Sequence, residues 1–144
     1  MTSLAPLRPH QALAFDGVRD ALRSGAKRVA LQAPTGAGKT VIAAHIVAGC
    51  LERRKRVVIC VPMISLVDQT YDRLVENGID PGDIGVIQAD HQLRRPHARV
   101  QIATPQTLSR RELPICDVVI IDECHVRHKV YDQWFADVAE EAVQ

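Results

Sequence analysis

Two short segments of this sequence hold the residue types that phosphate chemistry requires. The first is Ala33–Thr40 (APTGAGKT), which follows a short apolar run and precedes a helical pattern. Gly36 and Gly38 allow the backbone to turn its N–H groups around phosphate oxygens, and the following helix directs its positive end at the same place. Glycine loop, lysine and threonine after a predicted strand indicate a nucleotide-phosphate loop.

The side chains of this loop have separable predicted roles. Lys39 would reach the β- and γ-phosphates of ATP, and the hydroxyl of Thr40 would bind Mg²⁺. The predicted cofactors are therefore ATP and Mg²⁺. The predicted nucleotide contacts within the loop are Thr35, Gly36, Ala37, Gly38, Lys39 and Thr40.

The second segment, Asp122–His125 (DECH), begins directly after the apolar run 117–121. Parallel strands deliver functional side chains at their carboxyl ends, so both carboxylates should face the phosphate loop. Asp122 suits a role at Mg²⁺, and Glu123 suits orienting and deprotonating a water that attacks the γ-phosphate. The predicted catalytic residues are Lys39, Asp122 and Glu123.

Alternating strands and helices must position these groups. Helical spacing of apolar residues predicts a first helix that opens at Pro9 and stops at Gly25, and a last one that places Val130, Trp134 and Val138 on one face. Further helices are expected over 41–51 and 66–75, and strands over 28–32, 57–61, 84–87, 100–103 and 117–121. The continuously apolar strands indicate an α/β fold with a mostly parallel sheet and helices on both faces. The polar stretch 90–99 is expected to be the most flexible.

Composition limits the partners. Eighteen basic and seventeen acidic residues give a formal charge of +1, so any nucleic-acid contact has to be local. No apolar run has the length that a membrane span needs, so no membrane partner is expected. The four cysteines lack metal-clip spacing and are predicted to be reduced thiols of a cytoplasmic protein.

Together, APTGAGKT and DECH resemble motifs I and II of superfamily 2 helicases and translocases, with the DECH form of motif II. The order of the motifs is most similar to RadD-like helicases and to the ATPase subunits of type I and III restriction enzymes. The resemblance implies an N-terminal RecA-like ATP-binding domain over residues 1–144. It further implies that Gln11 hydrogen-bonds adenine and that His125 couples the nucleotide site to motif III.

Two weaker segments, 61–69 and 103–108, are similar to motifs Ia and Ib, which grip the nucleic-acid backbone in that family. The implied partner is nucleic acid, with DNA favoured over RNA. Ser65 and Thr104 could equally be helix N-caps. Arg94, Arg95 and Arg99 could touch phosphates or lie in a solvated loop. The predicted nucleic-acid contacts are Ser65, Gln69, Thr104, Arg94 and Arg95.

Family members continue with motif III and a second RecA-like domain that carries arginine fingers. Neither is found in this sequence, so the domain is expected to be truncated after motif II and to require a second RecA-like domain in cis or in trans. The strand of motif III would lie between the strands of motifs I and II. The favoured function is an ATP-hydrolysing helicase or translocase module, very slow as an isolated piece. The alternative is a truncated nucleotide-binding or regulatory fragment without unwinding activity.

Overall fold

A computed structural model describes residues 3–32, 38–88, 90–111, 113–123 and 128–133 of the chain. The helices are α1 (Pro9–Arg23), α2 (Lys39–Glu52), α3 (Ser65–Glu76) and α4 (Pro105–Leu108), with a 3-10 turn η1 (Pro81–Asp83). The strands are β1 (Val57–Cys60), β2 (Ile84–Val86), β3 (Val100–Ala103) and β4 (Val118–Ile121). Residues 129–133 are also helical.

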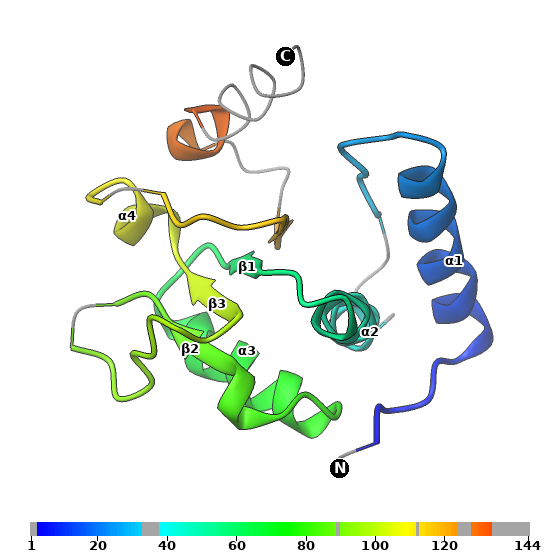
Figure 1. Cartoon of the computed structure of the whole chain (residues 1–144), viewed down its shortest axis with the longest axis horizontal. Helices are drawn as coiled ribbons and strands as arrows, with labels where there is room; N and C mark the ends of the chain where they lie inside the picture. Colours follow the sequence, from blue (N-terminus) through cyan, green and yellow to red (C-terminus); the bar gives the residue numbers. More distant parts are fainter. Residues whose placement is uncertain (1–2, 33–37, 89, 112, 124–127, 134–144) are drawn as a thin grey trace.

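The four strands form one parallel sheet in the order β2-β3-β1-β4 (Figure 1). Val57 lies between Val100 and Val118, so the carboxyl ends of β1, β3 and β4 reach the same edge. The predicted α/β fold with a parallel sheet is confirmed. Four of the five predicted strands are present, within one residue of their expected bounds.

The predicted strand over residues 28–32 is wrong for the structure described here. This segment has no strand pairing, and Val29 and Leu31 are each 38% exposed. An extended segment becomes a strand only when a neighbouring backbone accepts its hydrogen bonds. Among the described residues, β4 pairs with β1 alone, and no strand lies between β4 and residues 28–32. The apolar run therefore has the composition of a strand but pairs with no strand among the described residues.

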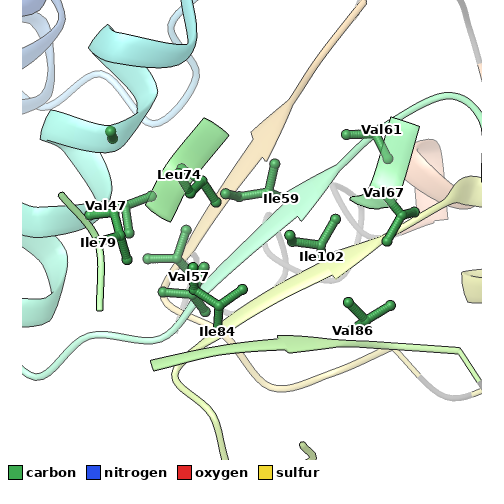
Figure 2. Close-up of a cluster of buried hydrophobic side chains, with 12 residues drawn as sticks. Val47, Val57, Ile59, Val61, Val67, Leu74, Ile79, Ile84, Val86 and Ile102 are labelled. Atoms are coloured by element: carbon green, nitrogen blue, oxygen red, sulfur yellow. The ribbon is translucent and has the colours of Figure 1, made fainter. Parts of the chain in front are cut away.

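Side chains alternate across the sheet and create two apolar layers. Val57 and Ile59 face one layer, which includes Val47 of α2 and Leu74 of α3 (Figure 2). Val58 and Cys60 face the other layer, with Leu108 of α4 and the helical residues Val130 and Tyr131. Helices thus cover both faces, as the continuously apolar strands indicate.

Each of the three longer helices ends in the same way. In α3, the N–H of Gly78 donates to Val75 O and the N–H of Ile79 donates to Leu74 O, which is the Schellman arrangement. Gly78 has φ +103, and Ser3 O lies 2.6 Å from the place where its Cβ would be. The predicted stop at Asn77-Gly78 is confirmed, and only glycine fits there.

Candidate nucleotide site

The phosphate loop is described from Gly38 onward; Thr35, Gly36 and Ala37 lie outside the described residues. Gly38 is the N-cap of α2 in the left-handed region, with φ 76 and ψ 45. Its carbonyl accepts from the N–H of Val41 at 3.1 Å, which starts the helix. Lys39 and Thr40 are therefore the first two residues of α2, where the helix dipole is positive. Lys39 is exposed.

Gln11 of α1 packs directly against this loop. Its side chain is only 5% exposed, and its Oε1 accepts the N–H of Arg8 at 2.9 Å. The amide nitrogen of the same side chain occupies the space where a Cβ on Gly38 would lie. The structure thus brings Gln11 and the phosphate loop together across 27 residues of sequence. Glycine at position 38 is required both by φ and by the close approach of Gln11.

The two carboxylates follow β4 at the carboxyl edge of the sheet. The N–H of Asp122 donates to Cys60 O at 2.9 Å, which extends the β1–β4 ladder by one residue. The N–H of Glu123 donates to Asp122 Oδ1 at 3.0 Å, and both side chains are exposed. Glu123 has φ 56, a conformation that costs a non-glycine residue about 1–2 kcal/mol. Such strain is concentrated at functional sites. His125 lies outside the described residues.

The predicted nucleic-acid contacts do not form one group. Ser65 and Gln69 are exposed and one helical turn apart at the start of α3. Thr104 is 2% exposed, and its Oγ1 accepts the N–H of Thr107 at 3.3 Å as the N-cap of α4. The hydroxyl of Thr104 therefore caps a helix, which is the second role that the sequence allowed for it. The exposed polar side chain next to it is Gln106, which the sequence analysis did not single out.

Arg95 lies at the other end of the sheet. Its Nη1 donates to Pro81 O at 2.6 Å, at the amino end of β2. The guanidinium thereby holds the turn η1, and the structure does not bring it near the carboxyl ends of the strands. Arg94 is exposed, and its N–H donates to His91 O.

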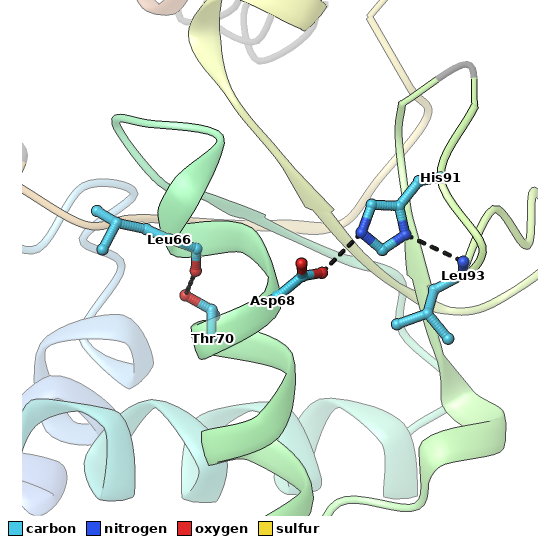
Figure 3. Close-up of polar contacts among 5 residues, drawn as sticks. All are labelled: Leu66, Asp68, Thr70, His91 and Leu93. Atoms are coloured by element: carbon cyan, nitrogen blue, oxygen red, sulfur yellow. Dashed lines mark hydrogen bonds and ion pairs between the residues drawn. The ribbon is translucent and has the colours of Figure 1, made fainter.

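An interaction that the sequence analysis missed anchors the stretch 90–99. His91 Nε2 donates to Asp68 Oδ1 at 2.7 Å, while His91 Nδ1 accepts the N–H of Leu93 (Figure 3). The N–H of Val86 in turn donates to Leu93 O at 2.9 Å. The stretch contains no helix or strand and is tied to α3 and to β2, while its predicted flexibility stays a prediction. The pair spans 23 residues of sequence, so no local pattern signals it.

The described cysteines are free thiols, as predicted. Burial raises the pKa of the Cys60 thiol to about 12, although a hydrogen bond with the Tyr131 side chain lowers it slightly. Burial, the thiol of Cys60 and the carboxylate of Asp122 all raise the pKa of Tyr131. Tyr131 is therefore protonated and packs in the apolar layer that contains Cys60. Cys124 lies outside the described residues.

Two features, a metal-binding cluster and a membrane-spanning helix, are not found among the described residues. Their histidine, cysteine and acidic side chains form no group of three that could hold a metal ion. None of the described helices has both the length and the apolar character needed to cross a bilayer.

The sequence matches a known protein family. Residues 4–141 match the family model described as "Type III restriction enzyme, res subunit". An uncharacterized helicase of Schizosaccharomyces pombe is 34% identical over 103 residues, covering 67% of this chain and 10% of that protein. The mRNA transport homolog 4 of Caenorhabditis elegans is 32% identical over 107 residues, covering 74% of this chain and again 10% of the relative. The chain spans about a tenth of the length of both.

Solved structures show the same fold. The UvsW helicase of bacteriophage T4 is similar with a TM-score of 0.67 and 25% identity, over 85% of this chain and 44% of that one. The SWI2/SNF2 ATPase core of Sulfolobus solfataricus, solved in complex with dsDNA, has a TM-score of 0.66 and 22% identity, over 83% of this chain and 26% of that one. The chain therefore belongs to the type III restriction enzyme res subunit family and is a RecA-like domain of the superfamily 2 helicase type.

Proposed function

We propose that this chain binds Mg-ATP and, within a complete motor, hydrolyses it to move along nucleic acid. The observation that carries the proposal is the packing of Gln11 against Gly38 at the start of α2, with Asp122 and Glu123 at the carboxyl end of β4. The matched family and the helicase relatives support it.

The residues present fit this role by their chemistry. Lys39 and the first N–H groups of α2 supply positive charge for phosphate oxygens. The hydroxyl of Thr40 and the carboxylate of Asp122 are oxygen donors of the kind that hold Mg²⁺, an ion that neutralises charge on the phosphates when bound. Gln11 presents an amide toward the loop and would orient the adenine base.

Glu123 would hold the attacking water and accept its proton. An exposed carboxylate one residue beyond Asp122 can do this only if its direction is fixed. The bond from the N–H of Glu123 to Asp122 Oδ1 and the left-handed backbone provide that direction. Glu123 would then act as general base while Asp122 remains at the cation.

For nucleic acid, we propose contacts to the backbone at the exposed start of α3, through Ser65 and Gln69, with DNA favoured over RNA. One similar structure is described in complex with dsDNA. The hydroxyl of Thr104 is committed to its cap, so Gln106 is the better candidate beside it. The free thiols favour a reducing compartment such as the cytoplasm.

Turnover would further require a strand between β4 and residues 28–32, and a second RecA-like domain that supplies an arginine finger. The absence of strand pairing between residues 28–32 and any described residue supports the first requirement. The same observation favours the second candidate function, a piece that binds nucleotide without turnover. An arginine finger is worth about 10³ to 10⁵ in turnover, so the two functions differ strongly in rate.

Titration of the 144-residue chain with a fluorescent ATP analogue and Mg²⁺ tests the nucleotide site. Lys39→Ala should weaken binding at least about tenfold, because it removes the charge that faces the phosphates. The exposed Lys27→Ala on the chain preceding residues 28–32 is the matched control and should bind like the parent. Equal binding by a folded Lys39→Ala variant would contradict the site.

A further inference from the structure

A hollow of about 250 Å³ opens at the amino edge of the sheet, opposite the carboxylates. Its lining combines the starts of β1 and β3 with the connections before β3 and β4. The lining residues are Arg56, Val57, Val58, Pro96, Ala98, Arg99, Gln101, Pro114 and Ile115. Strand β1 has four residues, about 13 Å of extended chain, so the hollow is separate from the nucleotide face.

Two cations stand side by side at this hollow. The N–H of Val57 donates to Arg99 O at 2.8 Å, so the pairing of β1 with β3 fixes Arg56 and Arg99 as neighbours. Both side chains are exposed, and neither guanidinium makes an ion pair or a hydrogen bond with a described residue. The carboxylate of Asp117 accepts the backbone N–H of Arg56 at 2.8 Å.

More positive charge adjoins the hollow through the exposed run 53–55, Arg-Arg-Lys. The chain as a whole carries a formal charge of only +1, so this concentration is a local field and not a property of the composition. A local field of this kind attracts and orients an acidic partner.

The same hollow has apolar walls. Val58, Pro96, Ala98 and Pro114 line it, and Ile115 beside it is 85% exposed, more than any other large apolar side chain described. The volume is below the usual range for small-molecule pockets, about 300–1,000 Å³, and suits a single large apolar side chain.

We propose that this hollow is a docking site for a partner protein segment in which one large apolar side chain is flanked by carboxylates. The apolar side chain enters between Pro96, Pro114 and Ile115, and the carboxylates face Arg56 and Arg99. A nucleic-acid backbone would match the charge and leave the apolar walls without a counterpart. Docking at the amino edge leaves the carboxylates after β4 accessible.

Fluorescence anisotropy of the 144-residue chain tests the site. The probe is a fluorescein-labelled peptide whose single leucine is flanked on both sides by aspartate and glutamate. The parent chain should bind it, and Arg56→Glu combined with Arg99→Glu should weaken binding at least about tenfold, since like charges would then face each other. Ile115→Ser, or serine in place of the peptide's leucine, should weaken binding about threefold or more.

The control is Arg23→Glu combined with Lys27→Glu, which changes net charge equally and lies on and just after α1. Its affinity should stay within about twofold of the parent, and circular dichroism should show all variants folded. Absence of binding by the parent, or an equal loss in the control, overturns the proposal. The proposal is also overturned if Arg56→Glu combined with Arg99→Glu weakens the binding of a single-stranded oligonucleotide but not the binding of the peptide. ATP-analogue binding should be unchanged throughout, which separates this result from the proposed function.

Discussion

The side chain and the backbone of Glu123 favour different residue types. Its side chain is the proposed general base, while its backbone has φ 56, a value that glycine adopts without steric strain. Replacing it by glycine should relieve the backbone and stabilise the fold by about 1 kcal/mol, because an L side chain at positive φ costs about 1–2 kcal/mol. Thermal unfolding measures this, and Glu123→Gln is the matched variant that should leave the midpoint unchanged.

Both substitutions should abolish hydrolysis in a complete motor, because each removes the base, while ATP binding should persist. A glycine variant that is both more stable and inactive would show that strain is kept for catalysis. A Gln variant that hydrolyses ATP at the parental rate would move the base elsewhere.

The buried thiol of Cys60 should make the free energy of unfolding depend on pH. Burial raises the pKa of its thiol from its ordinary value near 9.0 to about 12. Below pH 9 the thiol is protonated in both the folded and the unfolded state, so its contribution to stability is fully present. Between pH 9 and 12 only the unfolded chain loses the proton, and the free energy of unfolding should fall by about 1.4 kcal/mol per pH unit from this group.

Urea unfolding under reducing conditions at several pH values above and below 9 measures this slope. Cys60→Ala should lower stability at every pH through lost packing, and its decline with pH should be shallower than the parent's. Cys116 and Tyr131, whose pKa values are also raised, leave a residual slope. Parallel curves for parent and variant would rule out the role of Cys60.

At the scale of elements, the helix ends offer a controlled comparison. Helices α1 and α3 end in Schellman arrangements with Gly25 and Gly78 at the left-handed position, and α2 ends in the same arrangement with Arg54, at φ 56. Arg54→Gly should therefore stabilise the protein by about 0.5–1 kcal/mol. Denaturant midpoints at equal m-value measure it.

The neighbouring Arg53→Gly is the matched control, since Arg53 has φ −91 and gains nothing from glycine. It removes the same charge from the same exposed turn and should be neutral or destabilising by a few tenths of a kcal/mol. Equal effects of the two substitutions would assign the gain to charge and not to backbone conformation.

At the scale of the whole molecule, residues 28–32 and the outer edge of β4 should behave as an incomplete sheet. Amides of residues 29–32 should exchange with deuterium close to unprotected rates, while Val58 and Ile59 of β1, paired on both sides, should be strongly protected. Exchange measured by NMR on the 144-residue chain tests this. Protection of residues 29–32 equal to that of β1 would contradict the described sheet.

The same incompleteness explains why this chain should turn over ATP slowly by itself. The phosphate loop at α2 and Glu123 after β4 are not joined by direct strand pairing, and errors of about 1 Å in position cost roughly a hundredfold in rate. Steady-state ATPase of the chain, with and without single-stranded DNA, should show little stimulation. Stimulated turnover at the rate of a complete motor would show a self-sufficient ATPase.

The sequence by itself determined what is local. Apolar periodicity predicted helices α1, α2 and α3 and four strands, and Asn77-Gly78 predicted the end of α3, because each depends on neighbours within a few residues. The phosphate chemistry of the glycines, Lys39 and the paired carboxylates stays a prediction from their residue types and spacing. Tertiary structure decided what depends on distant partners. Residues 28–32 have strand composition without strand pairing to a described residue, Arg95 donates to Pro81 O of η1, and His91 meets Asp68 across 23 residues. Strand formation and side-chain pairing need a second segment to supply the complementary hydrogen bond, and no pattern within one segment reveals which segment that is.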